Sequence, residues 1–154
     1  MIEVPEPVLA AVAGLPVVGE LDQAFLLLTA HTSGPVDVCL LSRTELRATS
    51  HRVLLVTTSS KARRNLADNG RATLVAVTAD SAHYLALQLR RSVSDDNALA
   101  CEFTVARTLR DAMGVELRCL QFRVAETLRL QERWQRTADL LDRLESAADE
   151  VESG

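Results

Sequence analysis

The sequence predicts an α+β protein in which antiparallel, hairpin-connected strands form the body and a long helix ends the chain. Three observations predict this class. Short apolar runs with alternating side chains recur over residues 24–128, as expected of strands. Turn-forming residues separate these runs, and residues 131–151 repeat apolar side chains at helical spacing among alternating charges. Because the 154 residues are 47% hydrophobic, we expect a single domain over 1–154, with an N-terminal helical segment at 1–20 and a C-terminal helix at 130–151.

The first elements expected are a short helix and a β-hairpin. Two prolines at positions 5 and 7 precede an apolar stretch over residues 8–18 that contains Gly-Leu-Pro, which predicts a helix that ends near the glycine. Residues 24–30 form a continuous apolar run, and residues 31–35 are typical of a hairpin loop. Residues 36–41 then return as the second strand.

The stretch from His51 to Val77 lies in the middle of the chain and predicts a strand, a hydroxyl-rich turn, a basic helix and a second strand. Residues 53–56 are an apolar run, and Thr57-Thr58-Ser59-Ser60 supplies side chains that favour turns and helix N-caps. Asn69-Gly70 is a left-handed stop for the helix. Residues 71–78 resume a strand pattern.

The segments before and after this stretch have less regular hydrophobic patterns. Residues 42–50 are polar enough to be a connection, in which one helical turn could form around Glu45 and Leu46. Residues 82–93 alternate as a long strand, and residues 99–113 fit either a helix or a strand. Residues 115–128 alternate with a phase slip at 119–120 that a β-bulge would explain. The buried face of the long strand is expected to carry His83, Leu85, Leu87 and Leu89.

The charge on the central helix is unusual. Lys61, Arg63 and Arg64 lie in its first turn, although the positive end of a helix dipole disfavours each exposed cation by about 0.3–1 kcal/mol. A bound phosphate would relieve this, because hydroxyls, free N–H groups and cationic side chains would converge on it. The alternative is that the long side chains simply extend into water.

The order of these features resembles the FMN-binding split barrels related to pyridoxamine 5'-phosphate oxidase. The likeness runs over about residues 24–78: a hairpin AFLLLTAHTSGPVDVCLLS, a strand, a Thr/Ser-rich turn, a basic helix containing N-L and closed by N-G, and then R-A-T-L. It implies a six- to seven-stranded antiparallel split barrel (a β-barrel with α) with short peripheral helices, and it favours a strand at 99–113. It also implies a small FMN-dependent oxidoreductase of unknown substrate, a homodimer with flavin at the subunit interface.

If FMN binds, its phosphate is expected at the turn from Thr57 to Lys61, and its ring along the strand segments 38–42 and 53–58. No catalytic residue can be named, since a flavin carries the hydride chemistry itself. The residues expected to bind the cofactor are Leu40, Leu41, Ser42, Thr57, Thr58, Ser60, Lys61 and Arg64.

Two positions depart from the family pattern. Ala62 stands where a lysine is common, and the segment from Asp37 to Ser42 lacks the basic residues that often begin and end it. A carboxylate near a phosphate would be repulsive. The alternative function is therefore a cofactor-free or differently liganded split-barrel binding protein, with deazaflavin or haem in place of FMN.

Composition excludes several other classes. The net charge of -4 and the aromatic content of 3% argue against a nucleic-acid surface. The sequence has no Gly-rich nucleotide loop and no nucleophile motif, and its three histidines lack metal-ligand spacing. Three well-separated cysteines indicate buried free thiols in a reducing compartment. They are Cys39, Cys101 and Cys119.

The remaining expectations concern location and partners. Gly14 and Pro16 interrupt the N-terminal apolar stretch and the first basic residue is Arg43, so we expect neither a signal peptide nor a membrane span, and a cytoplasmic protein. The bias toward arginine, alanine, leucine and valine is typical of a high-GC bacterial genome. A small-molecule ligand and a homodimer are expected, with the apolar stripe around Trp134 and Leu141 packed on the same or the neighbouring barrel.

Overall fold

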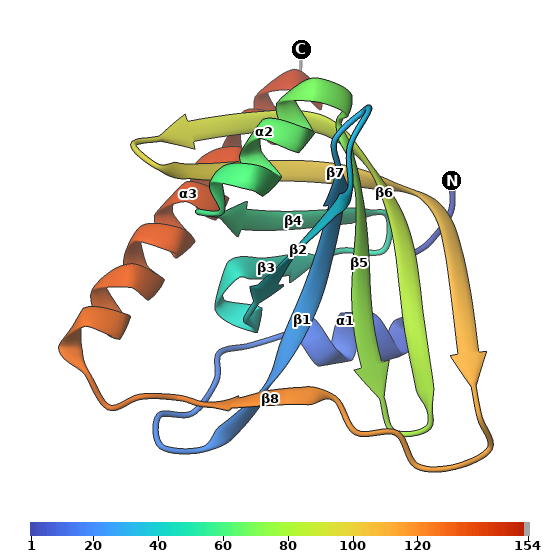
Figure 1. Ribbon diagram of the computed structural model, residues 1–154. Helices are drawn as coiled ribbons and strands as arrows, with labels where there is room; N and C mark the ends of the chain where they lie inside the picture. The colour runs from blue at the N-terminus through green and yellow to red at the C-terminus, as the bar shows by residue number, and fades with distance from the viewer. Residues whose placement is uncertain (153–154) are drawn as a thin grey trace.

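The strands form one strongly bent antiparallel sheet with three helices around it (Figure 1), as given by a computed structural model that describes residues 1–152. Side chains of residues 128–132 and 148–152 lie outside the described part. The strands are β1 (Leu21–Ala30), β2 (Val36–Leu41), β3 (Leu46–Ala48), β4 (Arg52–Thr57), β5 (Arg71–Thr78), β6 (Ser81–Asp95), β7 (Ala98–Ala112) and β8 (Leu120–Arg123). The helices are α1 (Glu6–Val12), α2 (Ser60–Asn69) and α3 (Leu128–Glu152), with a 3₁₀ turn η1 at Arg43–Glu45.

The sheet order is β2-β1-β5-β6-β7-β4-β3, and β8 pairs with the start of β1. The predicted class, an antiparallel barrel with peripheral helices and a C-terminal helix, is confirmed. The described residues form eight strands where six to seven were expected. One of them, β3, lies in the segment predicted as a connection, because three residues are too short to show an alternating pattern.

Strands β6 and β7 give the sheet its curvature. Each is 15 residues long, and Figure 1 shows both running along one side of the molecule and then turning across it. The pairing register shifts between Ala86 and Leu87 and again between Leu89 and Arg91, and such irregularities bend a strand and increase its twist. The bend lets β6 pair with β5 at one end while β7 pairs with β4 at the other.

The ambiguous segment 99–113 is a strand, and the pairing explains why. Cys101, Phe103 and Val105 alternate into the core, and β7 pairs with both β4 and β6. A helix over the same residues would leave the edges of both neighbouring strands unpaired. Tertiary pairing therefore decides between two patterns that the local sequence supports equally.

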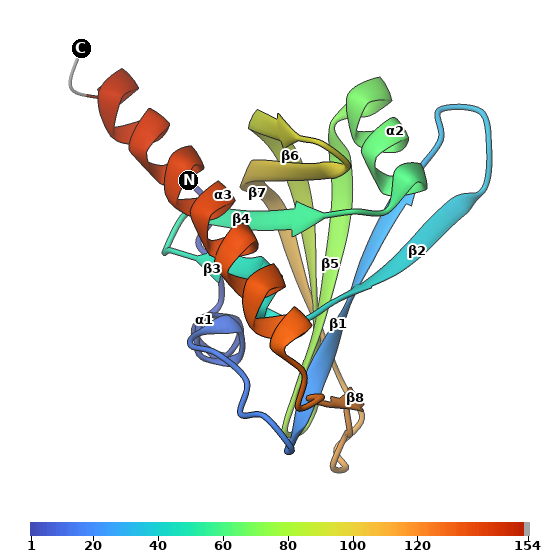
Figure 2. The same cartoon turned by 90° about the vertical axis from the view of Figure 1, so that its left-hand side faces the viewer.

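Strand β4 is buried on both faces. Val53 and Leu55 face the main core inside the barrel, whereas Leu54 and Val56 pack under α3. Figure 2 shows α3 crossing the outside of β3 and β4. This explains the continuous apolar run in the sequence, since only a strand covered on both sides needs apolar residues at every position. The part of α3 that covers it supplies Leu140, Leu141 and Leu144.

The predicted ends of the central helix are confirmed. The Ser59 hydroxyl accepts a hydrogen bond from the Ala62 N–H at 3.2 Å, and Gly70 closes the helix with φ of 66° and donates to the Leu66 carbonyl. The short N-terminal helix is also present and buries Val8 and Val12 in the core.

The last predicted strand is largely wrong. Only β8 forms within 115–128, and no bulge occurs at 119–120. The chain leaves the sheet after Ala112, and Gly114 turns it away with φ of 73°. The alternating pattern continues there without a partner strand. Strand β1, which pairs with β8, begins at Leu21 instead of the predicted residue 24. The first four residues of β1 are the ones that β8 pairs with.

The structure bears on two features expected from the composition, namely the state of the cysteines and the presence of a membrane span. The three cysteines are free, but only Cys101 is buried, and Cys39 and Cys119 are half-buried. Among the described residues, no helix is both long and apolar enough to cross a membrane.

Candidate functional site

A cavity of about 530 Å³ lies between α3 and the ends of β2 and β4. The turn between β6 and β7 and the segment around β8 complete its wall. Its volume lies within the range of about 300–1,000 Å³ that is usual for small-molecule sites. The apolar part of the wall consists of Pro16, Ala24, Leu40, Leu41, Val56, Ala98, Phe122, Val124, Trp134 and Leu140.

Polar side chains occupy the rest of the wall. Hydroxyls come from Ser42, Thr44, Thr58 and Thr137, and two cations come from Arg133 and Arg136 on α3. Arg136 lies 3.5 Å from the Asp96 carboxylate at the β6–β7 turn, in an exposed ion pair. The remaining polar residues are Glu45, Asp95 and Asn97.

Glu45 is held in the cavity wall by the chain around it. Its Oε1 accepts hydrogen bonds from the Ser42 N–H and hydroxyl, both at 3.2 Å, and the Ser42 and Thr44 hydroxyls are hydrogen-bonded to each other. Burial raises the pKa of Glu45 above its ordinary value, although these bonds and the nearby Arg133 oppose the change. This carboxyl is therefore fixed in place and easier to protonate than an exposed one.

Trp134 faces the cavity and is only half-buried. The sequence suggested a large buried ring on the apolar stripe of the helix. The stripe that packs on β4 begins further along, with Leu140 and Leu141. Trp134 lies before that contact, so its ring lines the cavity and is not enclosed by the core.

The eight residues predicted to bind a cofactor fall into two groups. Leu40, Leu41, Ser42 and Thr58 line the cavity, although they come from two separate strand ends. The other four do not line it: Thr57 is buried, with its hydroxyl accepting from the Ser59 N–H, and Ser60, Lys61 and Arg64 are exposed on α2.

One cation of α2, Lys61, has a partner that the sequence did not reveal. Asp37 Oδ1 lies 4.0 Å from Lys61 Nζ, and Asp37 Oδ2 accepts a hydrogen bond of 2.9 Å from the Asn65 amide. The same amide donates to the Thr29 hydroxyl at 3.0 Å. The chain thus supplies a carboxylate beside the first turn of α2, which relieves part of the crowding that suggested a bound phosphate.

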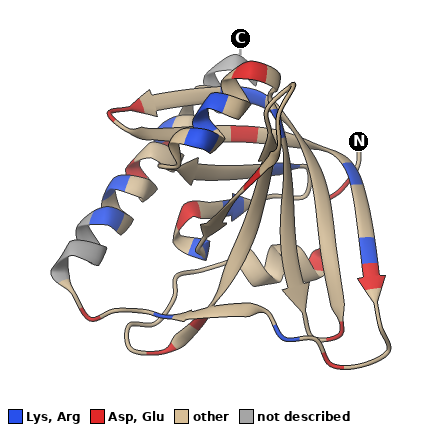
Figure 3. Ribbon diagram, viewed as in Figure 1, with Lys and Arg blue, Asp and Glu red and all other residues tan. Residues whose placement is uncertain are grey.

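The residues missed by sequence reasoning come mainly from α3. Arg133, Arg136 and Thr137 line the cavity together with Leu140. A helical spacing of three and four residues places these positions on one face. That spacing was visible in the sequence, but it did not show that this face looks onto β2 and β4. Figure 3 shows that both α2 and α3 carry basic residues, so charge alone did not distinguish them.

Comparisons with known proteins support the fold. No family model matches the chain, and no curated protein matches its sequence. An FMN-binding protein from Syntrophomonas wolfei is similar in structure, with a TM-score of 0.50 and 12% identity over 61% of this chain and 78% of that chain. The styrene monooxygenase flavin reductase from Pseudomonas putida S12 is similar with a TM-score of 0.51 and 12% identity over 69% of this chain and 89% of that one.

A putative oxidoreductase from Sinorhizobium meliloti 1021 is also similar, with a TM-score of 0.50 and 10% identity over 74% of this chain and 51% of that chain. At these identities the likeness concerns the fold. The chain has the split-barrel fold of the FMN-binding proteins related to pyridoxamine 5'-phosphate oxidase.

Proposed function

We propose that this protein is a small FMN-dependent oxidoreductase of the pyridoxamine 5'-phosphate oxidase-like type, with its flavin in the cavity under α3. The observation that carries the proposal is the composition of that cavity. Leu40 and Leu41 lie on one side, Trp134 lies on α3, and the hydroxyls of Ser42 and Thr58 mark its edge. From the segments 38–42 and 53–58 expected at a flavin ring, Leu40 to Ser42, Val56 and Thr58 lie in the wall of this cavity.

The wall suits the chemistry of FMN. A flavin ring is flat and largely apolar, with hydrogen-bonding atoms along one edge, and the cavity offers apolar walls with hydroxyls beside them. When bound, the flavin supplies hydride transfer. The chain's own part is to contact the ring through Leu40, Leu41 and Trp134, and to exclude water by covering it with α3.

The phosphate has two candidate anchors. The sequence favours the start of α2, and Thr58 connects the cavity to that turn. The cavity favours α3, because Arg133 and Arg136 line it, whereas Lys61 and Arg64 do not. We therefore assign the phosphate to Arg133 and Arg136 on α3, because charge-assisted hydrogen bonds to phosphate are stronger than hydrogen bonds between neutral groups.

The second candidate is a split-barrel binding protein that is cofactor-free or takes deazaflavin or haem. Asp37 beside Lys61 favours it, because a carboxylate at the start of α2 would repel a phosphate from the position that the family resemblance implies. Glu45 and Asp95 add further carboxyl groups to the cavity wall.

Titration with FMN tests the proposal. Purified protein should be yellow or, once stripped of flavin, should change the fluorescence of added FMN in a saturable way. Riboflavin, which lacks the phosphate, is the matched ligand and should bind more weakly. Failure to bind either flavin would contradict the proposal, and parallel titrations with a deazaflavin and with haemin would then separate the liganded alternatives from the cofactor-free one.

We further propose that the protein is a homodimer that uses the outer face of β2. Val36, Val38 and Leu40 lie on this face with 57–59% of each residue exposed. The pairing places Leu28 opposite Val38 and Leu26 opposite Leu40 on the neighbouring β1, and both are half-buried. An apolar strip over two strands is typical of an interaction surface. Since Leu40 also lines the cavity, a second copy would border the flavin site.

Sedimentation of Val38→Asp tests this surface. The wild type should sediment as a dimer at micromolar concentration, and the variant should shift toward monomer because a charge would be buried without a partner. Val115→Asp is the matched control: it makes the same change at a valine that is 57% exposed, as Val38 is, but lies outside the sheet. A monomeric wild type, or equal behaviour of both variants, would contradict the proposed interface.

A further inference from the structure

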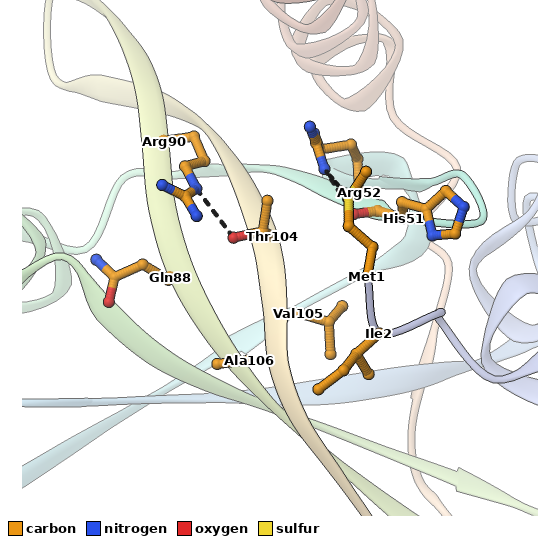
Figure 4. A pocket seen from close by; sticks show the side chains of 9 residues that line it. All are labelled: Met1, Ile2, His51, Arg52, Gln88, Arg90, Thr104, Val105 and Ala106. Atoms are coloured by element: carbon orange, nitrogen blue, oxygen red, sulfur yellow. Dashed lines mark hydrogen bonds between the residues drawn. The ribbon is translucent and has the colours of Figure 1, made fainter.

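A second cavity of about 390 Å³ lies over β4, β6 and β7, beside the N-terminal residues. Figure 4 shows Arg90 and Gln88 on one side of it and Arg52 and His51 on the other, with Thr104 between them on β7. None of its lining residues lines the cavity under α3. None of the strands β4, β6 and β7 pairs with β2, which carries the proposed dimer surface.

The polar lining is cationic. Arg52 and Arg90 both line the cavity, and no described lining residue is acidic. The Nε of Arg90 donates to the Thr104 hydroxyl at 3.1 Å. Among the described residues, Arg90 takes part in no ion pair. The outer nitrogens of its guanidinium are therefore available as donors at the cavity.

The charge of Arg52 is only partly balanced. Its Nε lies 4.0 Å from Glu102 Oε1, while the other oxygen of Glu102 accepts a shorter bond of 2.9 Å from Arg91. One carboxylate is thus shared by two arginines and lies closer to Arg91. Arg52 Nη1 also donates to the His51 carbonyl at 3.1 Å, a neutral acceptor.

The ring of His51 lies at the rim of the cavity and points away from Arg90 and Thr104 (Figure 4). Its Nδ1 is buried and has no hydrogen-bond partner among the described residues, although buried polar atoms are nearly always paired. The other side of the cavity is apolar and is formed by Ile2, Val105 and Ala106. The cavity therefore combines two guanidinium groups and an apolar wall.

We infer that this cavity binds a small organic anion, with its carboxylate or phosphate group between Arg52 and Arg90 and its apolar body against Ile2 and Val105. Guanidinium groups match planar or tetrahedral oxyanions with two parallel hydrogen bonds. The Thr104 hydroxyl accepts from Arg90, so its own hydrogen can be donated to the same oxyanion. The inference is independent of the flavin site, since the two cavities share no residue.

Binding of two simple probes, benzoate and phenyl phosphate, tests this inference in the full-length protein. Titration followed by NMR should shift the backbone amide signals of Arg52 and of Thr104 to Ala106. Arg90→Gln should weaken the affinity for the probe that binds by about tenfold or more, because it removes a charge-assisted contact. Arg90→Lys keeps the charge but cannot form two parallel hydrogen bonds to one oxyanion. Its affinity for the probe should lie between those of the wild type and Arg90→Gln.

Two variants serve as controls. Arg118→Gln also removes one positive charge, but Arg118 lies beside the start of β6, whereas Arg90 lies toward the other end of that strand. The Arg118→Gln variant should therefore bind the probe with unchanged affinity. Arg133→Gln, in the cavity under α3, should also leave it unchanged and so separates this site from the proposed flavin site. Preference for phenyl phosphate or for benzoate would identify which oxyanion the cavity takes. No amide shifts with either probe at millimolar concentration, or equal affinity in Arg90→Gln, would overturn the inference.

Discussion

Replacing both Arg133 and Arg136 by glutamine should weaken FMN binding by more than a hundredfold. Each substitution removes a cation from the wall of the cavity under α3. Loss of two charge-assisted hydrogen bonds to the phosphate corresponds to about 3 kcal/mol or more, which is over two orders of magnitude in the dissociation constant. Flavin fluorescence followed during titration measures the change. Riboflavin affinity should be almost unchanged, since that ligand has no phosphate.

Lys61→Ala combined with Arg64→Ala is the matched control, because it removes two positive charges from α2 instead. If the phosphate lay at the turn from Thr57 to Lys61, as the sequence suggested, this pair would carry the large loss of about 3 kcal/mol. The ion pair of Lys61 with Asp37 and the position of Arg64 outside the cavity lead us to expect a small effect. Equal FMN affinity in wild type and in the α3 double variant would place the phosphate elsewhere.

Leu141→Ala should reduce the free energy of unfolding by about 2–5 kcal/mol. Leu141 is 1% exposed and belongs to the cluster that joins α3 to Leu54 and Val56 on β4. Truncation removes buried methyl groups and leaves a void between helix and sheet. Urea unfolding followed by circular dichroism measures the loss. An unchanged midpoint would mean that α3 is merely appended to the barrel.

Trp134→Ala is the informative comparison for stability. A fully enclosed ring would cost about 3–5 kcal/mol when truncated, but Trp134 is half-buried and lines the cavity. Its truncation should therefore cost less than that of Leu141, although tryptophan is the larger residue. The reverse order would show that the ring is enclosed in solution, as the apolar stripe in the sequence first suggested.

Sequence reasoning succeeded where the signals are local. The cap residues Ser59 and Gly70 lie within the helix they terminate, so their chemistry could be read without knowing the fold. It was undecided over 99–113, where helical and strand spacing coexist and only pairing with β4 and β6 settles the outcome. It failed at β3, which is too short to show a pattern.

The candidate site also contains residues that the sequence indicated and residues that only tertiary packing brings there. Leu40 to Ser42 and Thr58, which the family resemblance suggested, do lie in the wall of one cavity. Arg133 and Trp134 could not be predicted there, because their position depends on how α3 packs on β4 through contacts made further along the helix. Asp37 was suspected as a repulsive neighbour of the phosphate, but its pairing with Lys61 requires the register of β2 beside α2.

The place of Trp134 gives the molecule a natural optical reporter. It is the only tryptophan in the chain, and it lies in the wall of the cavity under α3. Indole emission therefore comes from a single position, free of background from other tryptophans. Any occupant that absorbs in the near ultraviolet, as flavins, deazaflavins and haem all do, would take up that emission by energy transfer. The intact, unlabelled chain can thus signal whether its cavity is filled.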